Sequence, residues 1–527
     1  QAGDLDDLPE ECMEPLRMDW NRFLRKKYDS TEDLLAAWTP ELIGAGGELL
    51  SRGFRGWTFQ QSGEGEGRKE IVDDGPDGND ALRVTTTSVG RESWHVQLFY
   101  PNLAVQKDAF YHVEMWLRAS QERDVSVGLK MNHSPWQNLD SSRSIDVGTE
   151  WTKYEFSFSP SQTDSDARLD ISDLGDELGS LWVSDVSMKE GLPQTLSDDE
   201  NLEKNAVQII PRDVFAGRSS AAKRDWIEFL VERESQYYRD MVDYLHSELG
   251  VKCPVAGTQL SFGVLPSQME NDFIDIHGYW HHPSFPGRSW DASNWYVRNE
   301  SIVNDLDSVL ARLMLSQVEG RAYTVSEYNH PAPNTYSSEG IPLIAAYGAF
   351  HEWDGIYYYS YSHSNEYDEK SINSFFDIYG HTPKMLAMPT AAHLFLRKDI
   401  SSAEDVVVAT VEREEFIDLL TDRNGSTWGL SAETFGMPEL APYLHRTVMR
   451  FGRNLQSPDN PTVRDRRRLV SDTNELIWNR QRPGRHYVLI RSAKTQGFIG
   501  FVAEDEFELR DNVRLNVGPT MQNWANV

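Results

Sequence analysis

Residues 322–330 read AYTVSEYNH, a short apolar run that ends in a carboxylate, Glu327, and continues into polar and aromatic residues. Three similar runs lie nearby: CPVAGTQ (253–259), DFIDIHGYW (272–280) and DGIYYYSYSH (354–363). Helical patterns at 302–317 and 341–353 separate them. Strands that alternate with helices at this spacing indicate parallel βα units. We therefore predict an α/β fold in which residues 191–397 form half of a (β/α)8 barrel.

The sequence changes character on both sides of this segment. Residues 44–190 carry short alternating runs such as ALRVTTTSV and YHVEMWLRA, separated by Gly, Asp, Asn and Ser clusters, which is typical of a β-sandwich. Residues 1–43 are expected to be helical, because apolar residues recur at helical spacing over 11–38. From 398 to 527 the β pattern returns and predicts a second β-sandwich. The predicted architecture is a partial barrel with one inserted sandwich and one that follows.

Composition excludes several classes of function. The formal net charge of -32 argues against nucleic acid and against an anionic membrane surface as partners. No run approaches the about 18 apolar residues of a membrane helix, and no signal peptide is visible at the start. The two cysteines, Cys12 and Cys253, cannot form a disulfide framework. The 16 Trp and 21 Tyr are a surplus of the kind that often lines sugar sites.

Glu327 is the first candidate for catalysis. The active site of a parallel barrel lies at the C-terminal ends of its strands, and core packing explains a carboxylate there poorly, although a surface loop Glu is the alternative. The runs VSEYNH, IHGYWHHPSFPG and DGIYYYSYSH resemble strands seven, six and eight of clan A glycoside hydrolases. The resemblance implies that residues 191–397 are the C-terminal half of the barrel, strands five to eight, and that residues 1–43 are the barrel helix after strand four. It also implies a retaining β-glycosidase in which Glu327 is the nucleophile and Tyr279 donates a hydrogen bond that orients it.

The second carboxyl group of such a site is missing from this sequence. Retaining enzymes need two carboxyl groups about 5–5.5 Å apart, and in the clan the acid/base Glu follows an Asn at the end of strand four. The Asn-Glu pairs at 299–300, 365–366 and 474–475 do not follow an apolar strand in the right order. We expect either a fragment or strands supplied by another polypeptide. Because unpaired sheet edges promote association, the predicted partner is a homo-oligomer or a missing N-terminal half-barrel.

Polar and aromatic residues after the predicted strands are candidates for substrate binding. Trp280, Trp290 and Trp295 offer flat faces for sugar rings, with packing inside the loop as the alternative. Tyr361 and His363 lie at alternate positions of the last strand, so their side chains share one face. One face of each barrel strand points inward. The full set of candidates is His277, Trp280, His281, Trp290, Trp295, Asn329, His330, Tyr361, His363 and Trp136.

Trp136 belongs to the sandwich segment, which opens with LLSRGFRGWTF and closes with LWVSDVSMKEG. That segment resembles the jelly-roll carbohydrate-binding modules attached to cellulases and xylanases. Trp136 lies in the loop HSPWQNL and is the best exposed candidate for a sugar platform, whereas Trp116 and Trp182 alternate within strands and are expected in the core.

No resident metal or cofactor is expected in the barrel segment. The imidazoles of His277, His281, His282 and His330 are zinc-type ligands, but no spaced carboxylate or Cys accompanies them. A structural calcium ion in the sandwich is the one metal that we consider.

These observations predict a secreted glycoside hydrolase that acts on a β-linked polysaccharide or oligosaccharide, of the endo-glucanase (cellulase) type or a related β-glycosidase. The rival hypothesis is a non-catalytic carbohydrate-binding protein derived from such an enzyme. A transglycosylase would share the nucleophile and differ only in the acceptor.

Overall fold

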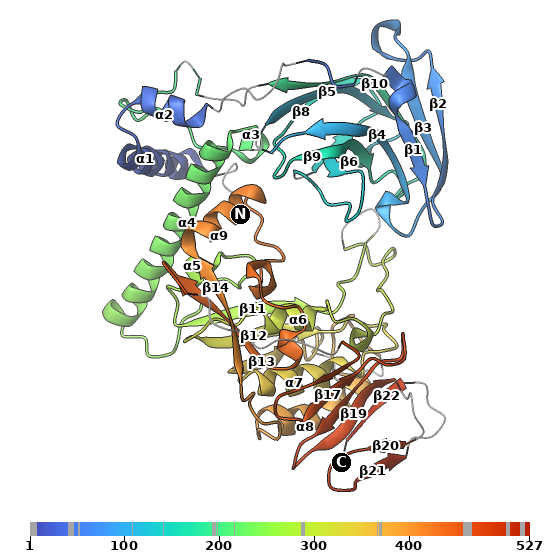
Figure 1. Cartoon of the computed structure of the whole chain (residues 1–527), viewed down its shortest axis with the longest axis vertical. Coiled ribbons are helices and arrows are strands. Elements are labelled where there is room, and N and C mark those ends of the chain that lie inside the picture. The colour runs from blue at the N-terminus through green and yellow to red at the C-terminus, as the bar shows by residue number, and fades with distance from the viewer. Residues whose placement is uncertain are drawn as a thin grey trace. The chain divides into compact units, whose positions relative to one another are not determined.

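The computed structural model describes residues 8–39, 47–50, 53–107, 109–140, 142–191, 196–197, 199–215, 217–285, 290–365, 367, 371–456, 466–501, 506–516 and 522–526. The chain divides into two compact units (Figure 1). Unit 1 comprises residues 1–230 and 417–426, and unit 2 comprises residues 231–416 and 427–527. Among the helices of the described ranges, none is both long and apolar enough to cross a membrane.

Helices at the start of unit 1 pack around tryptophans. They are α1 (Glu10–Lys27), α2 (Thr31–Trp38), α3 (Arg212–Phe215) and the first part of α4 (Ser220–Asp243). The ring of Trp20 lies 5.0 Å from that of Trp226 and 6.2 Å from that of Trp38. The prediction of one helix over 11–38 is wrong, because Ser30 starts a second helix by accepting a hydrogen bond from the amide of Asp33.

The β-sandwich of unit 1 consists of two antiparallel sheets with the orders β1-β4-β9-β6-β7 and β2-β3-β10-β5-β8 (Figure 1). The strands are β1 (Thr58–Gln61), β2 (Glu66–Val72), β3 (Ala81–Ser88), β4 (Val96–Val105), β5 (Phe110–Ala119), β6 (Arg123–Met131), β7 (Arg143–Val147), β8 (Thr152–Phe158), β9 (Asp164–Ser172) and β10 (Gly179–Gly191). Alternate residues of both sheets, such as Leu98, Val113 and Leu169, form one buried core. The predicted sandwich is thus present.

Unit 2 contains a parallel sheet with the order β11-β12-β13. These strands are β11 (Phe273–Tyr279), β12 (Ala322–Asn329) and β13 (Gly355–Tyr358). Between β12 and β13 runs α7 (Gly340–Phe350), whose residues are all buried, as expected for a helix that is apolar all round. Next to it lies α8 (Thr382–Phe395) (Figure 1). The register sets His277 opposite Glu327 and Tyr279 opposite Asn329.

The predicted half-barrel is not found. Within the described residues, only three of the four expected strands form, and they make up the sheet β11-β12-β13. The run at 253–259 is no strand, and next to β11 only a single parallel bridge joins Leu260 to Ile276. Pro254 cannot donate a backbone hydrogen bond and Gly257 weakens a strand, so the run does not form the regular backbone hydrogen bonds of a β-ladder. The helix predicted over 302–317 is reduced to α6 (Val309–Met314). A further short helix is α5 (Leu265–Gln268).

The C-terminal segment also differs from its prediction. In sequence, α9 (Arg413–Asp422) separates β14 (Val406–Glu412) from β15 (Arg446–Gly452), and these two strands pair in parallel. The segment for which we expected a second sandwich therefore begins with a βα crossover, because parallel strands need such a connection. Beyond it lies an antiparallel sheet with the order β16-β17-β18-β19-β22, and Phe507 of the hairpin β20-β21 packs against Phe498 of this sheet. These strands are β16 (Arg468–Val470), β17 (Leu476–Asn479), β18 (Tyr487–Arg491), β19 (Gln496–Phe501), β20 (Glu506–Glu508), β21 (Arg514–Asn516) and β22 (Gln522–Asn526).

Candidate functional site

The outer face of the sheet β1-β4-β9-β6-β7 carries charged groups that are shielded from solvent. Leu169 and Ile171 of β9 enter the core, so Arg168 and Asp170 point to the opposite face. Arg168 Nε lies 3.1 Å from Asp170 Oδ1, and Lys130 Nζ lies 2.7 Å from Asp170 Oδ2. Asp170 is fully buried, and its charge is balanced by these two cations. The face thus holds fixed donors and acceptors.

Aromatic rings border this network. The guanidinium of Arg168 lies 4.5 Å from the centre of the Phe99 ring and 5.8 Å from that of Trp136, and it donates a hydrogen bond to Gln97 at 3.2 Å. Trp136, in the loop between β6 and β7, is 56% exposed. Its φ of 62° is a strained conformation for a residue with a Cβ. The predicted sugar platform therefore stands beside polar groups that sequence reasoning missed.

The expectation that Trp116 and Trp182 lie in the core is wrong. Met115 and Leu117 take the core positions of β5, which leaves Trp116 half-buried on the outer face of the second sheet. Trp182 is half-buried on that face as well, and the guanidinium of Arg118 lies 4.5 Å from its ring. The alternation was visible in the sequence, but the choice of inward face was not.

Glu327 lies near the end of β12 with 32% of its side chain exposed. The hydroxyl of Tyr279 donates a hydrogen bond to Glu327 Oε2 at 2.5 Å, and His277 Nδ1 lies 3.2 Å from the same oxygen. On its other side His277 Nε2 lies 2.9 Å from Ser326 Oγ, which donates to Asp275 Oδ2 at 2.5 Å. Side chains from two adjacent parallel strands therefore hold one carboxylate in place.

Tyr279 is fixed as a hydrogen-bond donor. Burial raises the pKa of its phenol well above the usual range, and the hydrogen bond to Glu327 raises this pKa further. The ring packs against Phe376, with 4.6 Å between the centres, and meets Tyr359 edge-on. The expected pairing of Tyr279 with Glu327 is present in the structure, while the catalytic role of the pair stays a prediction.

Two predicted substrate ligands on β12 and just after it are buried. The side-chain amide of Asn329 donates to the carbonyl oxygens of Tyr359 at 2.5 Å and Phe376 at 2.6 Å. His330 Nε2 lies 3.0 Å from the hydroxyl of Tyr328, and burial lowers the pKa of His330 well below its usual value. Both side chains brace the end of the strand, so a direct contact with substrate through them stays a prediction.

Trp280 and His281 are likewise held by local contacts. Trp280 is buried and donates from Nε1 to the carbonyl oxygen of Glu300 at 3.0 Å. His281 Nε2 lies 2.9 Å from Glu300 Oε2, and burial lowers the pKa of this imidazole. Glu300, one of the Asn-Glu pairs, therefore pairs with His281 rather than with Glu327.

The last two candidates follow β13. His363 Nδ1 lies 2.6 Å from Asp377 Oδ1, a buried carboxylate that sequence reasoning missed. Tyr361 is 54% exposed and packs near the rings of Tyr367 and Tyr379. Tyr361 is thus free to meet a ligand, whereas His363 is already oriented by Asp377.

A cavity of about 1380 Å³ in unit 2 gathers the remaining tryptophans. Trp290 and Trp295 line it together with Phe375, and small polar side chains such as Asn299 and Asn334 complete the wall. Glu327 is not among the described residues that line this cavity. The ring of His282 lies 5.7 Å from that of Tyr279 and 5.8 Å from that of Trp290. Aromatic contacts therefore connect this cavity with the pair Tyr279–Glu327.

Sequence reasoning missed Asp275, Ser326 and the pair Phe375–Phe376 that supports Tyr279. Asp275 could have been predicted from the sequence, because it lies two residues before His277 on the same strand and so shares its face. Phe375 and Phe376 lie about a hundred residues from Tyr279 in sequence, and only the fold brings them together.

Of the four histidines considered for zinc, three have a polar partner and His282 packs against the rings of Tyr279 and Trp290. His281 pairs with Glu300, His330 with Tyr328, and His277 with Glu327. Searched over the described ranges, one group of three metal-type side chains lies close together, Asp405, His445 and Asp472 of unit 2.

In the sandwich, Asp124 and Asp146 face each other across β6 and β7, and their hydrogen bond raises the pKa of Asp124. Such a pair of carboxyl groups is compatible with the calcium ion considered above, which stays a prediction.

Comparison with known proteins places the sandwich in a family. Residues 47–172 match the family CBM_4_9, described as a carbohydrate binding domain. Similar solved structures include one described as "CBM4 structure and function" (20% identity, 26% of this chain and 86% of that chain, TM-score 0.23). Others are the CBM22-1 xylan-binding domain from Paenibacillus barcinonensis Xyn10C (15%, 28% and 97%, 0.22) and the N-terminal cellulose-binding domain from Cellulomonas fimi β-1,4-glucanase C (16%, 29% and 100%, 0.21). No curated protein matches the chain.

Proposed function

We propose that the chain is a carbohydrate-binding protein whose sandwich holds a glycan on the outer face of the sheet β1-β4-β9-β6-β7. The observation that carries this proposal is the family match over residues 47–172, because it spans every strand of this sheet. The predicted carbohydrate-binding module is confirmed for these residues.

The arrangement of side chains on this face supports the proposal. Saccharides are bound by apolar rings that stack on their CH faces and by fixed polar groups that meet their hydroxyls. Trp136 provides the exposed ring, and Lys130, whose side chain is 17% exposed, provides a donor. Arg168, Phe99 and Gln97 are buried beside these groups and hold them in place. Because these polar groups are held by Asp170 and by one another, little conformational entropy is lost when a glycan binds.

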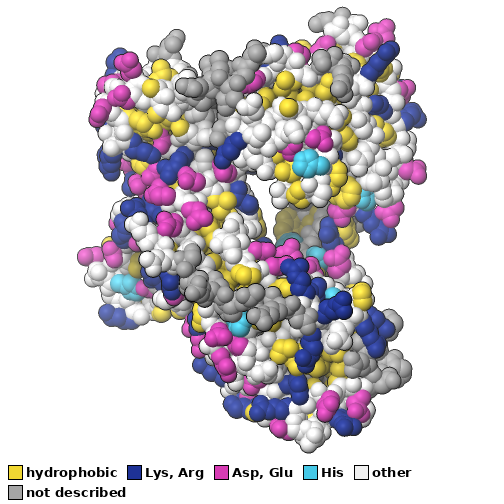
Figure 2. Space-filling model, viewed as in Figure 1, with side chains coloured by type: hydrophobic (Ala, Val, Ile, Leu, Met, Phe, Trp, Pro, Cys, Tyr) yellow, Lys and Arg dark blue, Asp and Glu magenta, His cyan; other side chains and the backbone are white. Residues whose placement is uncertain are grey.

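The charge of the chain favours an uncharged ligand. Acidic side chains are spread over the face in Figure 2, as expected for a net charge of -32. A polyanion would be repelled, so we propose a neutral β-linked polysaccharide or oligosaccharide. An extracellular location and a second copy of the chain as partner remain proposals as well.

Affinity gel electrophoresis of the full chain tests glycan binding. Gels that contain mixed-linkage β-glucan, xylan or hydroxyethyl cellulose should retard the protein, and Trp136→Ala should restore its mobility. Trp94→Ala is the matched control, because Trp94 is 48% exposed and Trp136 is 56% exposed. Unchanged retardation of the Trp136 variant would place the glycan elsewhere, and no retardation of the unmodified chain would refute the proposal.

A second function, retaining glycoside hydrolysis by unit 2, is favoured by the environment of Glu327. Tyr279 and His277 both contact Oε2, which orients the carboxylate as a nucleophile requires. In this proposal a Glu327 oxygen attacks the anomeric carbon, the leaving-group oxygen departs with the bonding electrons, and water hydrolyses the glycosyl ester. The acid/base that protonates a natural leaving group is assigned to another polypeptide or to a further part of the protein.

An aryl glycoside whose leaving group departs unprotonated separates the two functions. We expect the full chain to release dinitrophenol from dinitrophenyl β-glycosides, and Glu327→Gln to slow this release more than about 1000-fold. Glu300→Gln is the matched control, because Glu300 is a carboxylate of unit 2 that pairs with His281 and not with Tyr279 or His277. Hydrolysis that survives Glu327→Gln would exclude the nucleophile assignment. Glycan binding without any hydrolysis would leave carbohydrate binding as the only function.

A further inference from the structure

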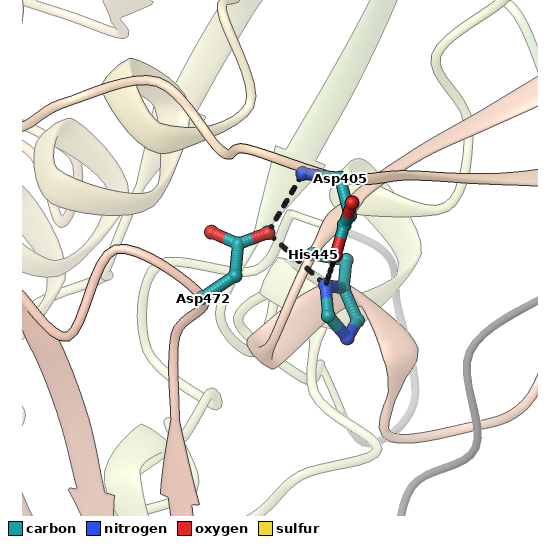
Figure 3. Close-up of side chains that lie close together, drawn as sticks. All are labelled: Asp405, His445 and Asp472. Atoms are coloured by element: carbon teal, nitrogen blue, oxygen red, sulfur yellow. Dashed lines mark hydrogen bonds and ion pairs between the residues drawn. The ribbon is translucent and has the colours of Figure 1, made fainter.

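Three side chains from separate segments meet at one end of the parallel pair β14–β15 (Figure 3). Asp405 directly precedes β14 and His445 directly precedes β15. Because the strands run in parallel with Val406 opposite Arg446, the residues just before them are neighbours. Asp472 comes from the turn after β16, where its amide donates to the carbonyl oxygen of Leu444 at 2.9 Å. Backbone contacts therefore hold all three segments together.

The donor atoms of these side chains are spaced as in a metal site. His445 Nδ1 lies 3.0 Å from Asp472 Oδ2 and 3.9 Å from Asp405 Oδ2, and the three ligand atoms lie within 4.8 Å of one another. In a tetrahedral zinc site, bonds of about 2.0–2.2 Å place neighbouring ligand atoms roughly 3.3–3.5 Å apart. Figure 3 shows both carboxyl groups directed at the imidazole.

The charges around this group favour a cation. The side chain of Asp472 is 8% exposed and that of His445 is 15% exposed, and Asp472 Oδ1 is buried without a hydrogen-bond partner among the described residues. A buried carboxylate requires compensation, and within the described ranges that of Asp472 meets the imidazole of His445 and the backbone N–H of Asp405, without a cation of its own. The guanidinium of the adjacent Arg446 is ion-paired with Glu352 instead. The side chain of Asp405 is 67% exposed, so water can complete the coordination.

We propose that Asp405, His445 and Asp472 bind a divalent transition-metal ion that fastens the start of β14 and β15 to the turn after β16. An imidazole nitrogen with two carboxylate oxygens suits Zn²⁺, whereas Ca²⁺ and Mg²⁺ prefer ligand sets made of oxygen alone. This ion is structural and is independent of the glycan sites proposed above.

Titration of the chelator-treated full chain with zinc chloride tests the site, by calorimetry and by thermal unfolding. We expect one tight site and, at a hundred-fold excess of Zn²⁺ over its Kd, a rise of about 4 °C in the Tm of unit 2. Asp405→Asn should weaken binding at least tenfold and remove most of the rise. This variant carries the test if His445→Gln does not fold, because Asp405 is exposed.

His246→Gln is the matched control. His246 Nε2 lies 2.8 Å from Asp272 Oδ2, a His–Asp pair that forms no group of three among the described residues. This variant should bind Zn²⁺ as the unmodified chain does. No zinc binding by the unmodified chain, or equal affinities for the unmodified chain and Asp405→Asn, would overturn the proposal.

Discussion

Replacing Trp136 by Ala should weaken glycan binding by an amount that the structure allows us to calculate. A Trp side chain presents about 250 Å² when fully exposed, and Trp136 is 56% exposed, which gives about 140 Å². A sugar ring stacked on one face covers roughly half of that area, about 70 Å². At about 25 cal/mol per Å² the lost burial is about 1.8 kcal/mol, or roughly a 20-fold increase in Kd.

Isothermal titration calorimetry with cellohexaose and xylohexaose measures this change. The folding of the variant should be unaffected, because the ring lies on an exposed loop. Trp94→Ala should change Kd less than twofold, since Trp94 belongs to the short helix Ser93–His95 before β4 and not to the loop that carries Trp136. A change below threefold for Trp136→Ala, or equal effects of the two substitutions, would refute the assignment of the stacking platform.

Three further predictions concern unit 2 and the helices of unit 1. Tyr279→Phe removes a hydrogen bond to a carboxylate, which is worth about 1.5–3 kcal/mol. The kcat/KM for a dinitrophenyl glycoside should therefore fall about 10- to 100-fold without loss of glycan binding. An unchanged kcat/KM would contradict the orienting role of Tyr279. Burial lowers the pKa of His351 from 6.5 to about 4. The contribution of the neutral imidazole to stability, on the order of 3 kcal/mol, is therefore complete above pH 6.5 and is lost as the pH falls toward 4. His351→Gln should flatten the fall of Tm between pH 7 and 4.5, and an equal fall of Tm in the variant and the unmodified chain would disprove this. Asp225 accepts hydrogen bonds from Lys27, Tyr28 and Trp38, so Asp225→Asn should lower the unfolding free energy of unit 1 by about 3 kcal/mol in urea titrations, and a loss below 1 kcal/mol would show that the cluster tolerates a neutral acceptor.

Local patterns were sufficient where one face of an element is apolar. The alternating runs of 44–190 predicted the sandwich, and AYTVSEYNH predicted β12 with Glu327 near its end. The contact between Tyr279 and Glu327 followed from the resemblance to clan A glycoside hydrolases, and the register of β11 against β12 brings the two side chains together.

Features that depend on long-range contacts were beyond such patterns. The run at 253–259 has the apolar residues of a strand, yet it forms none, and a single bridge to β11 comes from Leu260, the residue after it. The segment containing β14 reads like any β segment, and only its pairing with β15 shows that it is parallel. Trp116 was assigned to the wrong face because a period of two fixes alternation and leaves open which set faces the core. The outer-face network around Asp170 joins three strands that are distant in sequence.

The most direct test of glycan binding by the sandwich is a crystal structure of the chain with cellohexaose or xylohexaose. The account predicts sugar rings along the outer face of β1-β4-β9-β6-β7, with one ring stacked on Trp136 and hydroxyl groups within hydrogen-bond distance of Lys130 or Arg168. A sugar bound instead beside Trp116 and Trp182 on the other sheet, or a sandwich without sugar at saturating concentrations, would contradict it.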